Sequence, residues 1–248
     1  MVLWIIFPIC LSLVSFVGTW TVYGLAFSNN HVCSLSNWLV RGDNSCKGNQ
    51  STGCCSVPTI SSSGTRAPEN SLFTATINAG AFLFLLFCVF HHAHIMERHA
   101  CHSMLSKFAL VFGVVAAIGA FAAGNCNPHY LPLLHNLGAA ISFTCICFYT
   151  IMLTALTRKC MLTGYEKVLY PLRITSTVAQ IIVTICYTIL FAQDDYFYVH
   201  LSATFEWILS VNLELFELSF AVEFCFFSSF MLSNLLSKRN EEKPLMMT

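Results

Sequence analysis

Long apolar blocks, separated by mostly short polar connections, make up most of this chain. Six blocks come close to the roughly 20 residues that an α-helix needs to cross the hydrocarbon core of a membrane. They span about residues 4–27, 72–92, 108–126, 133–156, 171–192 and 203–229. The pattern predicts an all-α membrane protein, a six-transmembrane helix bundle over residues 1–236, followed by a cytosolic tail at 237–248.

The first apolar block has a competing interpretation as a secretory signal peptide. The apolar region of a signal peptide usually spans about 7–15 residues and follows a positively charged start. This block is longer, and neither Lys nor Arg precedes it. We therefore expect residues 4–27 to be an uncleaved membrane span.

Composition supports the membrane assignment. Of the 248 residues, 56% are hydrophobic and 10% are charged, whereas an ordinary soluble domain carries about 25% charged residues. The formal net charge is zero, so nothing favours nucleic acid as a partner, and membrane lipids are the partners that the composition predicts.

The distribution of Lys and Arg predicts which side of the membrane each connection faces, because cytosolic connections are enriched in these residues. With six spans, both termini lie on the same side. That side holds nine such residues, namely Arg98, Lys107, Arg158, Lys159, Lys167, Arg173, Lys238, Arg239 and Lys243. The opposite side holds three, namely Arg41, Lys47 and Arg66. The N- and C-termini are therefore expected in the cytosol, and the long loop at 28–71 outside the cell or in a lumen.

Two features of this loop agree with that orientation. Asn49 begins an Asn-Gln-Ser sequon, which is glycosylated only on the luminal side. Four cysteines, an even number, fit an oxidising compartment, and they are Cys33, Cys46, Cys54 and Cys55. Because Cys54 and Cys55 are adjacent, we expect each of them to pair with either Cys33 or Cys46, and the sequence leaves open which.

Four glutamates interrupt the last apolar block: Glu206, Glu214, Glu217 and Glu223. A carboxylate inside a membrane span is costly, so it usually faces the protein interior or a water path. Glu214 and Glu217 are three residues apart and share a helix face. They could form an ion path or a polar site, or they could make interhelical hydrogen bonds. Glu206 and Glu223 lie nearer the block's ends, where an interfacial position also explains them.

Few partners for these carboxylates are visible in the sequence. No Lys or Arg lies deep in a block, although Arg173 stands at the expected cytosolic mouth of the fifth. His135 and Asn78 are the best polar candidates within the spans.

A histidine-rich stretch at 91–102 looks at first like a metal site. It lacks a known zinc spacing such as a CxxC pair or HExxH, so we expect a juxtamembrane segment and no metal. Cys101 and Cys160 are candidates for palmitoylation, since both lie at an expected cytosolic membrane boundary. The chain also lacks G-x-S-x-G and Walker motifs, and we expect neither catalysis nor a cofactor.

The second half of the loop resembles a known signature. The order of residues matches the pattern P-x-I-S-x-x-G-x-x-x-P-E-x-x-[LI]-F of the DRAM / transmembrane-protein-150 family, in the Frag/DRAM/Sfk superfamily. The matching residues are Pro58, Ile60, Ser61, Gly64, Pro68, Glu69 and Phe73. Other marks of the family follow in order at Gly124, Asn125, His135, Gly138, Glu206, Trp207 and Glu223. The resemblance implies the same six spans.

Within this family, the loop cysteines are similar to those of the A-type branch. That branch resembles yeast Sfk proteins. The resemblance implies a non-catalytic plasma-membrane regulator that influences where phosphatidylinositol 4-kinase complexes sit, and an adaptor of such a complex as a partner. Other branches imply a modulator of macroautophagy in lysosomal or endosomal membranes, or a component of a mechanosensitive cation channel.

Overall fold

The computed structural model describes residues 2–36, 56–98, 102–160 and 162–227. All regular elements in this part of the chain are helical. They are η1 (Val2–Ile5), α1 (Ile6–Ser28), α2 (Ile60–Ser63), α3 (Glu69–Arg98), α4 (Ser103–Asn125), α5 (Pro132–Lys159), α6 (Glu166–Phe191), α7 (Tyr196–Leu218) and α8 (Ala221–Phe224).

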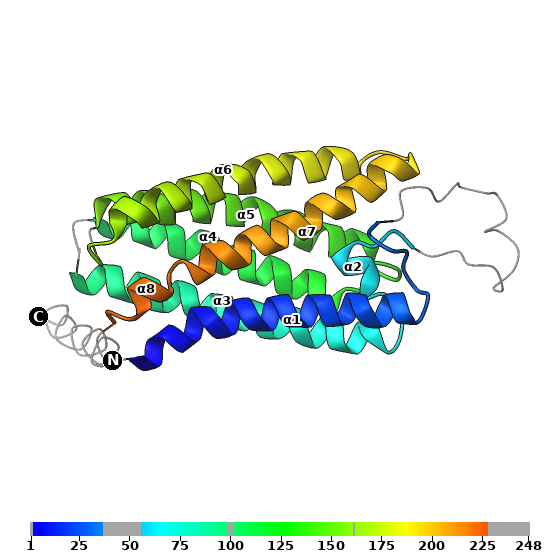
Figure 1. The fold of residues 1–248 in the computed structure, drawn as a ribbon, viewed down its shortest axis with the longest axis horizontal. Coiled ribbons are helices and arrows are strands. Elements are labelled where there is room, and N and C mark those ends of the chain that lie inside the picture. Colours follow the sequence, from blue (N-terminus) through cyan, green and yellow to red (C-terminus); the bar gives the residue numbers. More distant parts are fainter. Residues whose placement is uncertain (1, 37–55, 99–101, 161, 228–248) are drawn as a thin grey trace, which may run out of the picture.

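Six long helices form the bundle and run along the long axis of the molecule (Figure 1). Their contacts close them into a ring. Each helix packs against the next in the order α1, α3, α4, α5, α6 and α7, and α7 returns to pack against α1. The short helix α2 lies at one end, which we call the loop end. The described chain starts and finishes at the opposite end, which we call the terminal end, where Trp4 packs against Phe227.

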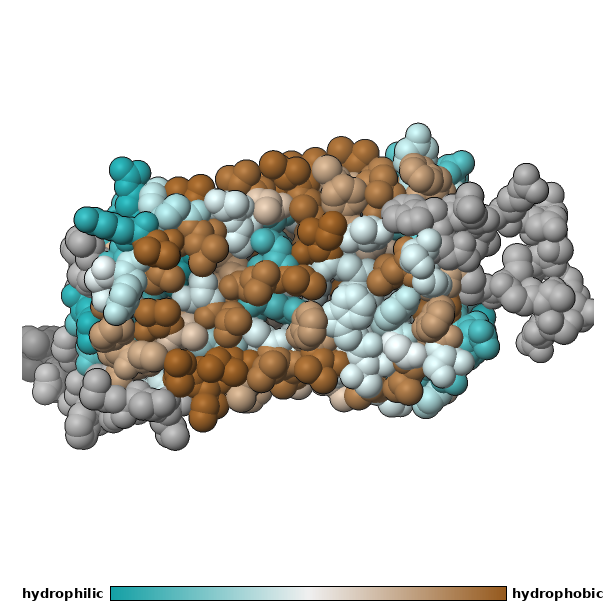
Figure 2. Space-filling model, in the orientation of Figure 1, coloured by the Kyte–Doolittle hydropathy of each residue, from teal (hydrophilic) through white to brown (hydrophobic). Residues whose placement is uncertain are grey.

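Five of the helices are long and apolar enough to cross a membrane: α1, α3, α4, α5 and α6. The sixth long helix, α7, is 23 residues long but is not among the five. Three buried glutamates make its composition less apolar. In Figure 2, many hydrophobic residues lie in the middle of the visible face, with some hydrophilic ones among them, and further hydrophilic residues lie at both ends.

The hydrophobic core consists of two clusters. The larger one lies towards the terminal end, where aromatic side chains such as Phe87 and Phe220 meet edge to face with their ring centroids 5.5 Å apart. The smaller one lies at the loop end and joins Val22, Phe73 and Trp207.

The last helical segment differs from the expected single span at 203–229. It begins earlier, at Tyr196, where the Asp195 side chain accepts a hydrogen bond from the backbone N–H of Phe197 at 2.8 Å. It ends at Leu218, and the chain turns at Ser219 before the short helix α8. An apolar block alone did not reveal this break, because the break depends on a partner from another helix, described below.

Candidate functional site

The motif half of the loop docks onto α7 at the loop end. Glu206 accepts a hydrogen bond through Oε2 from the backbone N–H of Ile60 at 3.2 Å. The indole of Trp207 donates to the backbone carbonyl of Pro58 at 2.9 Å and packs against Trp20, with ring centroids 4.5 Å apart. The Thr59 side chain caps α2 by accepting from the backbone N–H of Ser62. Residues about 150 positions apart in sequence therefore form one contact.

Glu69, at the start of α3, binds the residues just after α1, where the long loop begins. We call this part of the loop, together with the facing residue Ser56, its neck. The Glu69 side chain is completely buried. Its carboxylate accepts from the Asn29 side chain at 2.5 Å and lies 3.1 Å from Nδ1 of His31. Backbone hydrogen bonds join His31 and Cys33 to Ser56, so the two strands of the neck lie side by side. This arrangement fixes both ends of the loop on the bundle.

Close packing explains two glycines of the motif. A Cβ atom at Gly64 would overlap the ring of Phe73, and one at Gly138 would lie 2.8 Å from the carbonyl oxygen of Gly119. The second contact lets α4 and α5 approach backbone to backbone, as small residues do between membrane helices. At both positions a side chain would therefore prevent the close packing seen here.

Of the two polar residues expected to face the glutamates, His135 lines the same cavity as three of them, and both residues form hydrogen-bond contacts with other groups. Asn78 exchanges side-chain hydrogen bonds with Asn125, at 2.7 and 3.2 Å. Nδ1 of His135 lies 2.8 Å from the backbone carbonyl of Ala123 and 2.9 Å from that of Cys126. The expectation that Asn78 would serve the glutamates was wrong, because its amide is used to join α3 to α4.

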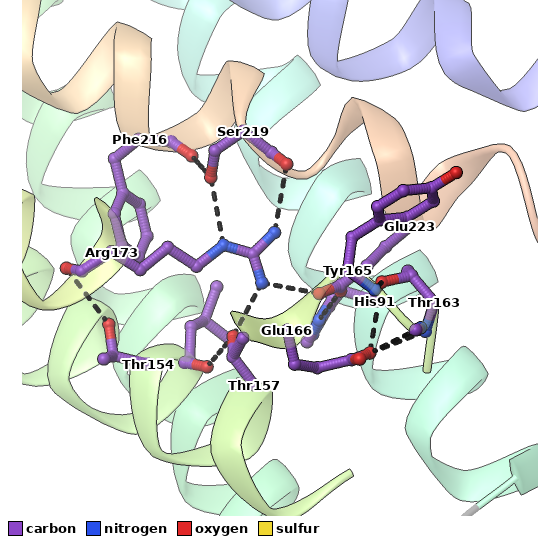
Figure 3. Close-up of polar contacts among 12 residues, drawn as sticks. His91, Thr154, Thr157, Thr163, Tyr165, Glu166, Arg173, Phe216, Ser219 and Glu223 are labelled. Atoms are coloured by element: carbon purple, nitrogen blue, oxygen red, sulfur yellow. Dashed lines mark hydrogen bonds and ion pairs between the residues drawn. The ribbon is translucent and has the colours of Figure 1, made fainter. Parts of the chain in front are cut away.

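A buried ion-pair cluster lies towards the terminal end (Figure 3). Arg173 of α6 is completely buried, and its Nη1 donates to Oε1 of Glu223 at 2.5 Å and to the Thr157 hydroxyl at 2.6 Å. Its Nε and Nη2 donate to the side chain and the carbonyl of Ser219. Nε2 of His91 lies 3.2 Å from Oε2 of Glu223. The Arg173 guanidinium thus lies at the break between α7 and α8. There it donates to the backbone carbonyl of Ser219, where the helix is interrupted.

This cluster shows which of the expected alternatives applies to Glu223. Its carboxylate makes an interhelical ion pair with Arg173, and both side chains are buried. The Arg173 guanidinium also lies over the Phe220 ring, 3.4 Å from its centroid. Since the charges and their hydrogen-bonding atoms are largely satisfied, the arrangement is suited to joining four helices and leaves little capacity for a ligand.

A partly open cavity of about 190 Å³, which we call the axial cavity, lies among the helices of the ring. Side chains from α1, α3, α4, α5 and α7 line it, together with Ile60 and Ser61 of α2. Three carboxylates of α7 face this space, those of Glu206, Glu214 and Glu217. They are 6%, 6% and 3% exposed. The sequence therefore grouped Glu214 and Glu217 on the correct face of the helix, and the structure places that face inside the ring.

Comparison with known proteins now adds to this geometry. Residues 3–226 match the family model described as the Frag1/DRAM/Sfk1/Cwh43P N-terminal domain. The chain belongs to the Frag1/DRAM/Sfk1 family. The resemblance seen in the loop motif is thereby confirmed. Because the match covers all six long helices, the loop-docking contact, the ion-pair cluster and the axial cavity all lie within the family domain.

Several relatives cover most of the chain. Transmembrane protein 150A of Xenopus laevis is 32% identical over 227 residues, 89% of this chain and 83% of that protein. Human Transmembrane protein 150A is 30% identical over 233 residues, 90% of this chain and 84% of that protein. Modulator of macroautophagy TMEM150B-A of Xenopus laevis is 29% identical over 221 residues, 89% of this chain and 86% of that protein. No solved structure matches the chain.

The remaining predicted sites of this Frag1/DRAM/Sfk1 member are cysteines and one asparagine. Cys33 is in a disulfide bond. The other loop residues, Cys46, Asn49, Cys54 and Cys55, lie outside the described residues, as does Cys101, so their roles stay predictions. Cys160 has no exposed surface. Palmitoylation there stays a prediction that the structure does not favour, because an acyltransferase needs access to the thiol.

The histidine-rich stretch contributes to packing in the family domain. His91 contacts Glu223, and Nδ1 of His92 lies 2.8 Å from the Ser106 hydroxyl. The described residues contain no group of three or more His, Cys, Asp or Glu that could hold a metal ion. The sequence did not reveal the role of Arg173. The available signal was an arginine at the start of the fifth apolar block, together with an unexplained glutamate, Glu223, in the sixth.

Proposed function

We propose that all six long helices cross the membrane, with the terminal end in the cytosol and the loop at 28–71 outside the cell or in a lumen. The support for α7 as the sixth span is its place in the ring, where it lies between α6 and α1. The support for the orientation is the excess of Lys and Arg in the connections at the terminal end.

Glycosylation tests this topology. The wild-type protein, expressed in mammalian cells, should lose mass when N-glycosidase F is added, and the Asn49→Gln variant should not. A new sequon placed in the connection after α5 should stay unmodified. Glycosylation of the sequon after α5, with none at Asn49, would reverse the orientation.

We further propose that the protein is a non-catalytic regulator that influences the localisation of a phosphatidylinositol 4-kinase complex, and thereby phosphatidylinositol 4-phosphate synthesis, at the plasma membrane. The observation that carries this proposal is the greater similarity to Transmembrane protein 150A than to the TMEM150B relatives. It agrees with the A-type cysteines of the loop. The kinase role itself rests on the resemblance of that branch to Sfk proteins.

The terminal end offers a surface for such an adaptor. Large side chains are exposed there, in the connection before α6 and in the first turns of α4 and α6. Met104 is 62% exposed, Tyr165 is 60% exposed and Val168 is 67% exposed. Beside them, the Glu166 side chain accepts from the backbone N–H groups of Thr163 and Gly164. This bonding holds the connection before α6 in a fixed shape, as a docking surface requires.

A rescue experiment tests the kinase proposal. Cells that lack the gene should show less phosphatidylinositol 4-phosphate sensor and less kinase at the plasma membrane, and the wild-type chain should restore both. A Tyr165→Ala/Val168→Ser variant should reach the membrane without restoring them. Tyr130→Ala is the matched control, because Tyr130 is 76% exposed in a connection at the loop end. Unchanged sensor and kinase in the knockout cells would refute the proposal.

A second candidate function is modulation of macroautophagy in lysosomal or endosomal membranes. It is favoured by a relative whose name describes it as a modulator of macroautophagy. The same knockout cells distinguish the two candidates. Altered autophagic flux, with tagged protein in endolysosomes and a normal sensor signal, supports this second candidate. Normal flux with the protein confined to the cell surface refutes it.

A further inference from the structure

The walls of the axial cavity are mainly apolar. They include the side chains of Phe84, Phe143 and Ile146, in addition to several alanines of α4 and α5. An apolar cavity of about 150 Å³ in a protein holds a molecule of the size of benzene. The cavity here, at about 190 Å³, is large enough for one aromatic ring with a short chain, or for the first part of an alkyl chain.

The ionisable side chains that line the cavity are three glutamates and His135. Nδ1 of His135 lies within hydrogen-bond distance of the backbone carbonyls of Ala123 and Cys126. No Lys or Arg is among the described residues that line it, and neither Glu214 nor Glu217 forms an ion pair with a described residue. Oε1 of Glu214 accepts from the Ser210 hydroxyl at 3.1 Å. Oε2 of Glu214 is buried with no hydrogen-bond partner in the described part of the chain. A buried polar atom without a partner is costly.

Glu206 provides an internal comparison. It faces the same cavity from the same helix, but its Oε2 is occupied by the backbone N–H of Ile60. The protein therefore satisfies the carboxylate near the loop end and leaves the Glu214 side chain, about two helical turns further along, with spare acceptor capacity. A ligand that supplies a cationic donor would satisfy that capacity.

We propose that the axial cavity binds an amphiphilic amine. The ammonium group donates hydrogen bonds to the carboxylates of Glu214 and Glu217, and the apolar part lies against Phe84 and Phe143. The shared chemistry is a protonated amine on a hydrophobic body, whether it comes from a small lipophilic amine or from the amine end of a long-chain lipid. This inference is independent of the kinase and macroautophagy proposals.

Thermal unfolding of the purified full chain, in nanodiscs of phosphatidylcholine, measures the binding. The probe is 2-phenylethylamine, whose ring and chain match the cavity. Its neutral isostere 2-phenylethanol and the anion 3-phenylpropanoate are the ligand controls. We expect saturable stabilisation by the amine, with an apparent affinity about tenfold or more above that of the alcohol, as a charge-assisted hydrogen bond provides. Dodecylamine in a second series distinguishes the lipid source, since a long-chain ligand then binds tighter than 2-phenylethylamine.

Three variants locate the site. Glu217→Gln should reduce the affinity for the amine about tenfold and leave that for the alcohol unchanged. Ala139→Phe, which places a ring in the cavity and leaves every carboxylate in the sequence, should abolish binding of both. Asp194→Asn removes an exposed carboxylate near the start of α7 and should bind as wild type does. If Glu217→Gln does not fold, Glu214→Gln and Ala139→Phe still decide the question.

Four results would overturn the proposal. Equal binding of amine and alcohol would reduce the site to an apolar void, and tighter binding of 3-phenylpropanoate would reverse its charge preference. A loss of amine binding in Asp194→Asn as large as that in Glu217→Gln would place the binding effect at the surface. Stabilisation by K⁺ alone at constant ionic strength, lost in Glu217→Gln, would make this a site for an inorganic cation.

Discussion

Buried carboxylates lie within ten residues of each other in α7 and α8, and they differ in whether they have partners. Glu223 has a partner for each carboxylate oxygen, Arg173 for one and His91 for the other. Glu214 has one oxygen with no partner in the described chain, and Glu217 has no ion pair there. Burial of a carboxylate therefore does not by itself indicate its role. Its partners do: the paired carboxylate of Glu223 joins helices, whereas the carboxylate of Glu214 faces the cavity with an unoccupied acceptor.

The largest effect should come from breaking the paired set. Arg173→Met leaves Glu223 buried without its main partner, and removal of one member of a buried pair costs about 3–5 kcal/mol. We expect a loss of that order in the free energy of unfolding, measured by denaturation of the purified protein in detergent. The double variant Arg173→Met/Glu223→Leu should recover part of the loss. An equally large loss in the double variant would mean that the guanidinium acts mainly through Ser219 and Thr157.

Glu206 lies between the two extremes and should give an intermediate effect. Glu206→Leu leaves the buried N–H of Ile60 without an acceptor, at a cost of about 1–3 kcal/mol. Glu206→Gln keeps a carbonyl oxygen in place and should cost less. Because this contact holds α2 on α7, limited proteolysis within residues 28–71 should also be faster in the Leu variant. Identical behaviour of the two variants would show that the hydrogen bond does not anchor the loop.

The smallest effect should have the opposite sign. Glu217→Gln replaces a buried carboxylate that lacks an ion-pair partner with a neutral group of the same shape. We expect the ligand-free protein to gain about 1 kcal/mol, seen as a higher midpoint of thermal unfolding. Asp194→Asn, on the exposed surface, should stay within about 0.5 kcal/mol of wild type. A clear loss of stability in Glu217→Gln would show that this carboxylate is structural, like Glu223.

The sequence predicted the helices well, because the length of an apolar block is a strong signal for a helix that can cross a membrane. The helix boundaries were less accurate, and the reason lies in polar residues that the fold buries. The second block was expected at 72–92, whereas α3 extends from Glu69 to Arg98. Glu69 is stabilised by Asn29 and His31, and His91 by Glu223. Hydropathy alone assigns such residues to connections.

The contacts between distant residues were beyond the reach of the sequence. Recognition of the family motifs identified Pro58, Glu206 and Trp207 as marks of the family without showing that they touch. The pairing of Arg173 with Glu223 depends on the order of helices around the ring and on a break at Ser219. Neither follows from periodicity along one segment. By contrast, the shared face of Glu214 and Glu217 was predictable, because it depends only on the geometry of a single helix.

The closure of the ring by α7 has a consequence for how the protein is made. A ribosome adds about 5–20 residues per second, and segments assemble in the order in which they emerge. In the six-span topology proposed above, α1 and α6 have no helix between them until α7 is inserted, and the nascent protein is an open arc. The last long helix both seals this arc and delivers Glu206, Glu214 and Glu217 to the cavity. We therefore expect a chain that stops before α7 to leave the inner faces of α1 and α6 without their partner helix.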